Sequence, residues 1–385
     1  MFSDFKPLES ALKEIPVSRR FGRVIAVDTA AIRIAGLSIH GHVGDQITIS
    51  KTCGTHIAGE IIALEQSYVL AMPYGPSDGI AIADLVELTF ANSVRPSESW
   101  VGRIIDAFGQ PLDGRPLYRG EASVPLRRPP PAAASRRLLG ARLNTSLAVF
   151  NTILPIAQGQ RVGIFAGSGV GKSSLLAEMA RGLECDIVVI ALIGERGREL
   201  KEFTEQVLGP EGMKRTIIIT ATSDQSPLVK RRAAWMATAV AEYFRDRGRH
   251  VLLLMDSITR FAEAHREVAL TAGEAPSLRA FPPSTANLIA SLAERAGPGP
   301  EGAGDITAIF TVLVAGSDME EPIADITRGV LDGHVILDRE IAEGGRFPAI
   351  DINRSVSRCL PAIATADENV LIVATRKTVG IFEKA

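Results

Sequence analysis

Ala166-Gly-Ser-Gly-Val-Gly-Lys172-Ser173 lies between an apolar run, Arg161–Phe165, and a helical pattern, Ser173–Arg181. The three glycines allow the backbone to curl so that its N–H groups face a triphosphate, and the helix adds the positive end of its dipole. Lys172 then neutralises the β- and γ-phosphates, and the Ser173 hydroxyl ligates Mg²⁺. Ala166 stands where this motif usually has glycine. With a strand before it and a helix after it, the run predicts a phosphate-binding loop.

The chain around this loop alternates buried-looking strands with helical patterns. The near-continuous apolar runs are Arg161–Phe165, Ile187–Ile193, Thr216–Thr220, Val251–Met255, Ile306–Val314 and Val335–Leu337. The helical patterns between them include Ser173–Arg181, Leu228–Arg247, Arg260–Leu270 and Thr285–Arg295. Strands that are apolar on both faces are typical of a mainly parallel sheet covered by helices. The fold class is therefore α/β, with a P-loop nucleotide-binding domain.

The N-terminal part has a different texture. Between residues 19 and 93, short β-rich runs follow one another and are separated by Gly, Asp and Pro at close intervals. This pattern predicts a small antiparallel β-barrel or a sandwich. Residues 1–18 carry Leu8, Leu12 and Ile15 at helical spacing. This amphipathic segment is interpreted either as a surface helix of its own domain or as a tail that binds a partner.

Composition excludes several classes of protein. The 385 residues contain 44 acidic and 42 basic side chains, so the net charge of the molecule does not indicate electrostatic binding to nucleic acid. Three dispersed cysteines exclude a disulfide scaffold and a cysteine-based zinc finger. The apolar runs fall far short of the ~20 residues that span a membrane, and the N-terminus does not resemble a secretory signal. These features predict a soluble cytoplasmic protein.

Residues 114–140 are rich in proline and arginine. Arg127-Arg128-Pro129-Pro130-Pro131 cannot continue a helix or a central strand, so this stretch is predicted to be a linker or a surface excursion. Its arginines could contact lipid head groups or RNA, although arginines in a loop are more often simply solvated.

Two acidic side chains follow apolar strands downstream of the loop. Asp256 ends the run Val251–Met255, which is the arrangement of a Walker-B acid beside a phosphate loop. Glu195 follows Ile187–Ile193, where a carboxylate could polarise the water that attacks the γ-phosphate. From spacing alone, a solvated charged loop is the better interpretation of the Glu195 region.

Together, these motifs resemble a known family. GIFAGSGVGKSSLL (163–176), GERGRELKEF (194–203) and EYFRDRGRHVLLLMDSITRFAEAHREVAL (242–270) resemble the rotary-ATPase alpha/beta superfamily, on the branch of the flagellum-specific and type III secretion export ATPases. WVGRIIDAFGQPLDG (100–114) and ADITRGVLDGHVILDRE (324–340) agree with this resemblance. So does the ten-residue signature PAIDINRSVS (348–357), which Arg358 follows.

The resemblance implies a role for each matching position. It places ATP against Ala166, Gly167, Ser168, Gly169, Val170, Gly171, Lys172, Ser173, Ser174 and Phe347, the last of these against adenine. It assigns Mg²⁺ to Ser173 and, through water, to Asp256. Glu195 is the water-activating carboxylate, with Lys172 at the phosphates. Arg196 and Arg260 lie near the phosphates or the subunit boundary, and Arg358 is an arginine finger for the neighbouring subunit.

The implied activity is Mg-ATP hydrolysis, proton-coupled or export-coupled, that energises flagellar protein export. The implied assembly is a homohexamer in the cytoplasm, at most peripheral at the inner face of the cell membrane, without nucleic acid. The implied partners are the export apparatus, a regulator or stator protein that binds the N-terminal segment, export substrates and chaperones. The alternatives are a virulence-type secretion ATPase, a Rho-like RNA translocase and a noncatalytic ring subunit.

The resemblance covers residues 20 to 358, and the C-terminal tail departs from the family. The family has a helical C-terminal domain after the position of Arg358, whereas residues 359–385 show no long helical pattern. Val370–Ala374 and Val379–Phe382 are predicted to be strands instead. We therefore expect four parts: segment 1–18, barrel 19–93, ATPase domain 94–358 and a short tail 359–385, with the helical domain missing or reduced.

Overall fold

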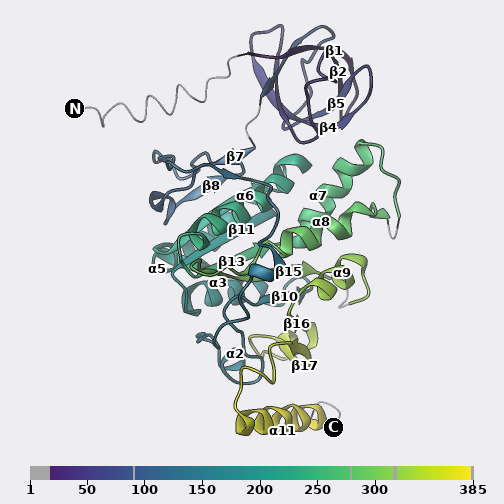
Figure 1. Cartoon of the computed structure of the whole chain (residues 1–385). Helices are drawn as coiled ribbons and strands as arrows, with labels where there is room; N and C mark the ends of the chain where they lie inside the picture. Colours follow the sequence, from purple (N-terminus) through teal and green to yellow (C-terminus); the bar gives the residue numbers. More distant parts are fainter. Residues whose placement is uncertain (1–17, 90–91, 278–279, 315–318, 383–385) are drawn as a thin grey trace, which may run out of the picture. The chain divides into compact units, whose positions relative to one another are not determined.

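The computed structural model describes residues 18–89, 92–277, 280–314 and 319–382. The helix expected within residues 1–18 lies, apart from Ser18, outside the described residues. The chain divides into two compact units, which are described separately (Figure 1). One comprises the N-terminal residues to Asn92 together with 271–273, and the other comprises 93–270 and 274 onward.

The first unit is a closed antiparallel barrel in the order β1-β2-β5-β4-β3-β6. Its strands are β1 (Phe21–Val27), β2 (Ile32–Ala35), β3 (Gln46–Ser50), β4 (His56–Leu64), β5 (Val69–Pro73) and β6 (Leu85–Thr89). Alternate residues of β1 and β2 point inward, and Ile32 and Ile34 of β2 fill the interior together with Ile47 of β3. This period of two buries one face of each strand. The prediction of a small β-barrel is confirmed, and the sandwich is excluded.

The second unit is built on a mainly parallel sheet, which contains nine strands within the described part of the chain. Its order is β17-β16-β10-β15-β13-β11-β12-β8, and β14 pairs with β15. The strands are β8 (Ile104–Asp106), β10 (Arg161–Ala166), β11 (Ile187–Glu195), β12 (Thr216–Thr222), β13 (Val251–Asp256), β14 (Gly297–Pro298), β15 (Asp305–Leu313), β16 (Gly333–Leu337) and β17 (Ile350–Ser357). β17 runs antiparallel at one border, and β7 (Ser93–Val94) pairs with β9 (Val124–Pro125) outside this sheet. The α/β fold class is confirmed.

Helices connect the parallel strands. They are α2 (Ala148–Thr152), α3 (Lys172–Gly182), α4 (Gly197–Glu202), α5 (Gly209–Met213), α6 (Pro227–Arg245), α7 (Ile258–Thr271), α8 (Ser284–Ala293), α9 (Pro322–Val330), α10 (Arg339–Glu343) and α11 (Ala366–Phe382). A π-helical turn, Phe203–Leu208, joins α4 to α5, and two 3₁₀ turns cover Glu98–Trp100 and Ala133–Ser135. α6 is buried almost all round and packs against β11, β12 and β13 (Figure 1). Helices and strands share one core, in which Leu176 of α3 packs with strand residues such as Ile164 and Ile190.

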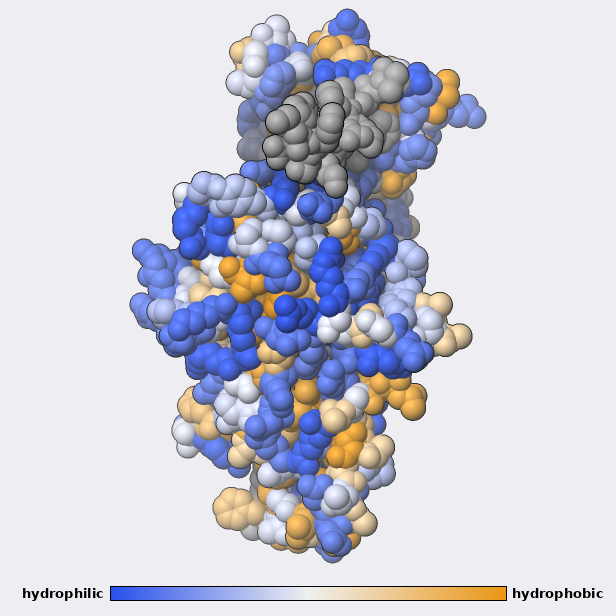
Figure 2. Space-filling model, turned by 60° about the vertical axis from the view of Figure 1, so that its left-hand side comes forward, coloured by the Kyte–Doolittle hydropathy of each residue, from blue (hydrophilic) through white to orange (hydrophobic). Residues whose placement is uncertain are grey.

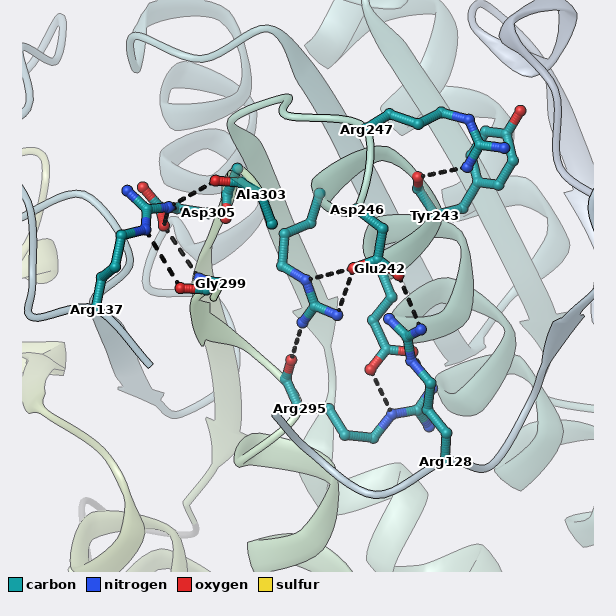
Figure 3. A network of polar contacts seen from close by, with 12 residues as sticks. Arg128, Arg137, Glu242, Tyr243, Asp246, Arg247, Arg295, Gly299, Ala303 and Asp305 are labelled. Carbon is teal, nitrogen blue, oxygen red and sulfur yellow. Dashed lines mark hydrogen bonds and ion pairs between the residues drawn. The ribbon is translucent and has the colours of Figure 1, made fainter. Parts of the chain in front are cut away.

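The proline- and arginine-rich stretch packs along the edge of the sheet where the parallel strands begin, called the amino edge here. Arg128 pairs with the fully buried Glu242 at 2.8 Å, and Arg295 pairs with the same carboxylate at 2.6 Å (Figure 3). Arg137 pairs with Asp305, the first residue of β15, at 2.6 Å. The Arg127 guanidinium lies 3.7 Å from the ring centre of Trp235. These arginines therefore have partners within the protein, because buried carboxylates require them, and the interpretation of a simply solvated loop is wrong.

The C-terminal tail is helical, which corrects the prediction of two strands. α11 spans 17 residues and includes both segments expected to be strands. Its start is capped reciprocally: the Thr365 hydroxyl accepts the Glu368 N–H at 3.2 Å, and the Glu368 carboxylate accepts the Thr365 N–H at 2.8 Å. This capping box outweighs the β-propensity of the valines and isoleucines.

Several apolar side chains of α11 are exposed, among them Val370, Leu371, Val373, Ile381 and Phe382. α11 lies at the bottom of Figure 1, and orange and beige atoms are also seen at the bottom of Figure 2. In the part of the chain that the structure describes, α11 is the one helix that follows β17. Among the described residues, no helix combines the length and the apolar composition that crossing a membrane requires.

Candidate active site

Four parallel strands deliver polar side chains to one edge of the sheet, called the carboxyl edge here. β10 runs into the phosphate-binding loop, β13 ends at Asp256, β11 ends at Glu195, and β15 carries Thr311 near its end. These strands are neighbours in the order β10-β15-β13-β11. Because the carboxyl ends of parallel strands meet at the same edge, residues far apart in sequence converge there.

The loop adopts the conformation that its glycines permit. Gly169 and Gly171 have φ values of 78° and 84°, in the left-handed region that side chains avoid. Gly171 occupies the N-cap position of α3, so the helix begins at Lys172 and directs its free N–H groups at the loop. A Cβ atom at Gly171 would lie 3.2 Å from the Phe347 ring. The loop and Phe347 therefore lie next to each other in the structure.

Lys172 lies between two carboxylates. Its ammonium donates a short hydrogen bond to Asp256 and stands 3.9 Å from Glu195 Oε1. The Thr311 hydroxyl donates to the same Asp256 oxygen at 2.6 Å. Only 4% of the Asp256 side chain and 12% of the Lys172 side chain are exposed, so this charge pair is shielded from solvent.

Glu195 has an unusual proton affinity. Burial raises the pKa of its carboxyl to about 7, and repulsion from Asp256 adds to this effect, whereas Lys172 opposes it. Glu199, one helical turn further on, hydrogen-bonds to Glu195, and the pKa of Glu199 is lowered by that bond. Glu195 therefore gains or loses its proton near neutral pH, as a general base requires.

A cavity of about 150 Å³ opens in front of these groups. Ser173, Glu195, Glu199 and Asp256 line its polar side, and Leu192 and Phe203 contribute to its apolar side. Hydroxyl and carboxylate oxygens are the ligands that Mg²⁺ prefers. Among the described residues, no group of three or more His, Cys, Asp or Glu side chains could hold a metal by itself. The donors thus fit an ion that is bound together with a phosphate rather than in an all-protein cage.

A second, larger cavity of about 620 Å³ also borders the loop. It is bounded by Gly171, Ser174 and Glu178 of the α3 region and by Phe347 and Pro348. The Phe347 ring is 62% exposed, so it stands at the mouth of the cavity rather than in the core. The volume suits a nucleoside, for which an aromatic side wall is a common partner.

Two predicted arginines lie at the border of the site. Arg260 packs its aliphatic stem against Gly194, where a Cβ would lie 3.1 Å away, and its guanidinium pairs with Glu263 at 2.8 Å. Arg196 is largely exposed and pairs with Glu199 at 3.4 Å. Both border the Glu195 segment, but the structure pairs each with a neighbouring acid instead of with the Lys172 cluster.

Arg358 does not join the other predicted residues. β17 runs antiparallel to β16, with Ile350 opposite Leu337 and Ser357 opposite Gly333. Phe347 therefore lies at the phosphate-loop end of the sheet, and Arg358 lies at the amino edge. Its side chain is exposed, and its guanidinium donates to the Arg328 carbonyl at 3.3 Å. Arg358 thus cannot serve the loop of its own chain.

Two residues of the site were missed by sequence reasoning. Thr311 holds Asp256, but a single threonine in an apolar strand carries no signal of its own. Glu199 holds Glu195, and its signal was the four-residue spacing between the two acids at the start of a helix.

Comparisons with known proteins agree with this geometry. The family model described as ATP synthase alpha/beta family, nucleotide-binding domain, matches residues 146–357. A flagellum-specific ATP synthase of Caulobacter vibrioides is 43% identical over 98% of this chain and 86% of the relative. A type 3 secretion system ATPase of Xanthomonas euvesicatoria is 40% identical over 94% of this chain and 81% of the relative. The assembled ATPase EscN of the enteropathogenic E. coli type III secretion system superposes with a TM-score of 0.87 at 35% identity, covering 94% of this chain and 87% of EscN.

Proposed function

Because the chain belongs to the ATP synthase alpha/beta family, on the branch of the flagellum-specific and type III secretion ATPases, we propose that it hydrolyses Mg-ATP to energise protein export for flagellum assembly. The observation that carries this proposal is the contact of Lys172 with Asp256 and Glu195 beside the phosphate-binding loop. The flagellar role is favoured because a relative with that name reaches 43% identity over 98% of the chain. A virulence-type secretion role is the alternative, since a relative of that type reaches 40%.

Binding of the triphosphate uses groups that the fold has already positioned. The N–H groups of the loop and of the start of α3 cradle the phosphates, and Lys172 adds a point charge. Ser173 and Asp256 would hold Mg²⁺ beside the phosphates. The ion supplies positive charge against the phosphate oxygens. Lys172 exchanges part of its bond with Asp256 for the phosphates, so phosphate oxygens replace a carboxylate oxygen as its partner.

Hydrolysis requires a water molecule aligned with the γ-phosphorus. Glu195 accepts a hydrogen bond from that water and takes up its proton as the new P–O bond forms and the bond to the β-phosphate oxygen breaks. Its raised pKa suits this role, because a carboxyl near pKa 7 can accept a proton at neutral pH. Glu199 positions Glu195 by holding its carboxyl group.

Replacement of Glu195 by Gln tests this role. The variant retains size and hydrogen bonding but cannot take up a proton, so ATP binding should persist while turnover falls by about two orders of magnitude or more. Glu205→Gln, an exposed acid on the neighbouring π-helical turn, is the matched control and should turn over like the unmodified protein. A loss of turnover smaller than about threefold in Glu195→Gln would make Glu195 a structural residue and remove the basis of the proposal.

We further propose a homo-oligomeric, hexameric ring in which Arg358 completes the site of the next subunit. Two observations support this: Arg358 is exposed at the edge of the sheet opposite its own loop, and the related EscN has been solved as an assembled ATPase. An arginine supplied in this way stabilises charge on the transferred phosphoryl group and contributes about 10³-fold or more.

Mixing two inactive chains tests the shared site. Lys172→Ala retains the finger, and Arg358→Ala retains the loop, so each alone should be nearly inactive. Random assembly of equal amounts restores about a quarter of the interfaces in a cyclic arrangement, and activity should recover toward that fraction. In the control mixture, Arg354→Ala, on the strand that precedes Arg358, replaces Arg358→Ala. The Arg354→Ala variant alone should remain active. A mixed ring as inactive as its components would show that Arg358 does not act across the interface.

The cellular part of the proposal places the ring in the cytoplasm, at most peripheral at the membrane, with residues 1–18 as the contact for a regulator or stator. Export substrates, their chaperones and the export apparatus are the other proposed partners. Deletion of the gene should abolish flagella and motility, which microscopy and swimming assays measure. Normal flagella together with lost effector secretion would favour the virulence-type role. Hydrolysis should not respond to added single-stranded RNA, and strong stimulation would favour the translocase alternative.

A further inference from the structure

The larger cavity follows one face of α3 away from the phosphate-binding loop. Gly171, Ser174, Leu175, Glu178 and Gly182 line it, and their spacing of three or four residues places them in one row along the helix. At about 1.5 Å per residue, Glu178 lies roughly 10 Å beyond Gly171 along the helix axis. This is comparable to the reach of a nucleoside triphosphate from its β-phosphate to the exocyclic group of its base.

The carboxylate of Glu178 is half-buried at this position and has no ion-pair or hydrogen-bond partner among the described residues. The nearby Ser146 hydroxyl donates to the Glu178 backbone carbonyl at 3.4 Å, not to the carboxylate. Arg181, the nearest cation on the same helix, donates to the Val207 carbonyl instead. An ionised carboxylate is an acceptor only, so Glu178 offers the cavity a charged acceptor, and Arg181, which also lines the cavity, does not pair with it.

We propose that Glu178 is a specificity-determining residue that selects adenine by accepting a hydrogen bond from its 6-amino group; this inference rests on the proposed ATPase function. With the phosphates on the loop and the base beside Phe347, the edge of the base faces α3. Adenine carries an amino donor at position 6, whereas guanine carries a carbonyl acceptor there. The carboxylate attracts the former and repels the latter, so one residue supplies both attraction and rejection.

The predicted size of the effect follows from the charge on the acceptor. A hydrogen bond to a charged group changes affinity by about 10- to 100-fold. Competition against a fluorescent ATP analogue, measured with Mg²⁺ and without turnover, gives the dissociation constants of ATP, purine riboside triphosphate and GTP. Purine riboside lacks the 6-amino group and adds nothing in its place. Wild type should bind ATP at least about tenfold more tightly than either competitor.

Variants assign this preference to the side chain. Glu178→Met preserves length and apolar contacts, and should reduce the preference for ATP over purine riboside triphosphate to within about threefold. Glu178→Gln can donate to a carbonyl as well as accept, so its affinity for GTP should rise relative to that for ATP. Glu184→Gln, an exposed acid just beyond the same helix, is the control and should behave like wild type. Thermal melting verifies that each variant is folded.

The outcomes distinguish this inference from the proposed function. Equal affinities of wild type for the three nucleotides, or a preference that persists in folded Glu178→Met, overturns the role of Glu178 while ATP hydrolysis stands. Tighter binding of GTP than of ATP also overturns it, because a carboxylate can accept from N1–H and the 2-amino group of guanine. Failure of wild type to bind any nucleotide overturns both the role of Glu178 and the proposed ATPase function. Hydrolysis of ATP by the same preparation shows that this failure has not occurred.

Discussion

The two edges of the central sheet carry the same types of charged residue, but one edge is a structural network and the other is the candidate active site. At the amino edge, Arg128 and Arg295 share the buried Glu242, and bonds from Arg128 and Arg245 keep the pKa of Asp246 below its usual value despite burial. At the carboxyl edge, Lys172 alone faces Asp256 and Glu195, and the pKa of Glu195 rises to about 7. At the amino edge, arginines outnumber the carboxylates and keep them ionised. At the carboxyl edge, carboxylates outnumber the lysine that contacts them, so Glu195 can take up and release a proton near neutral pH. The ratio of partners, not the presence of charges, separates a structural network from a candidate site.

The largest effect should come from removing Lys172, the cation that contacts both Asp256 and Glu195 at the carboxyl edge. Lys172→Ala deprives the triphosphate of its point charge, so ATP turnover should fall by about 10³-fold or more. Steady-state phosphate release measures this, with Lys201→Ala, an exposed lysine on α4, as the control. Turnover within tenfold of the unmodified protein would contradict the assignment of the site to this edge.

The amino edge should respond in stability instead. Glu242→Ala leaves Arg128 and Arg295 without their shared buried partner, which should cost about 3–5 kcal/mol in the free energy of unfolding. Denaturant titration measures the loss. At a temperature where the variant is folded, ATP turnover per folded chain should stay within about threefold. A large loss of turnover without a loss of stability would mean that the two edges are not separate in function.

The pH dependence should belong to the carboxyl edge. Burial raises the pKa of Glu195 to about 7, so the carboxyl is protonated below that pH and ionised above it. The value of kcat/KM for ATP, which reports the free enzyme, should therefore rise by about tenfold between pH 6 and pH 8. Glu195→Gln should show a flat profile over this range. A profile that is flat in the unmodified protein would exclude Glu195 as the titrating base.

The smallest effect should come from a half-exposed member of the amino edge. Arg137→Ala removes one partner of Asp305, which still accepts hydrogen bonds from the Gln158 amide at 2.7 Å and the Gly299 N–H at 3.2 Å. Because these bonds remain, the cost in stability should be only about 1 kcal/mol. Thermal or denaturant unfolding measures this cost. A loss as large as that of Glu242→Ala would show that the arginine-rich stretch folds as one cooperative unit with the sheet.

Much of the fold could be predicted because its signals are local. Glycine spacing specifies the loop, and continuous apolar runs mark the parallel strands to within a few residues. The convergence of Lys172, Asp256 and Glu195 followed from the rule that parallel strands end together. Thr311 could not be found in this way, because its role depends on the order in which β15 and β13 lie side by side.

The errors have equally particular causes. The tail was predicted to be strands because its valines and isoleucines dominate any count of propensity, while Thr365 and Glu368, which start the helix, occupy only two positions. The arginines of 127–137 were interpreted as solvated because their acidic partners lie more than a hundred residues away. Pairing at that distance in sequence leaves no local pattern.

The direction of β17 has a mechanical consequence. This strand of eight residues starts three residues after Phe347, which borders the larger cavity, and ends at Ser357, directly before the exposed Arg358. In the ring proposed above, it would act as a stiff lever with one end at each of two successive catalytic centres. Closing one centre around its nucleotide would then shift the trigger of the next. Nucleotide binding at one site would then affect the next site in a single direction around the ring, and the direction of β17 would determine which one.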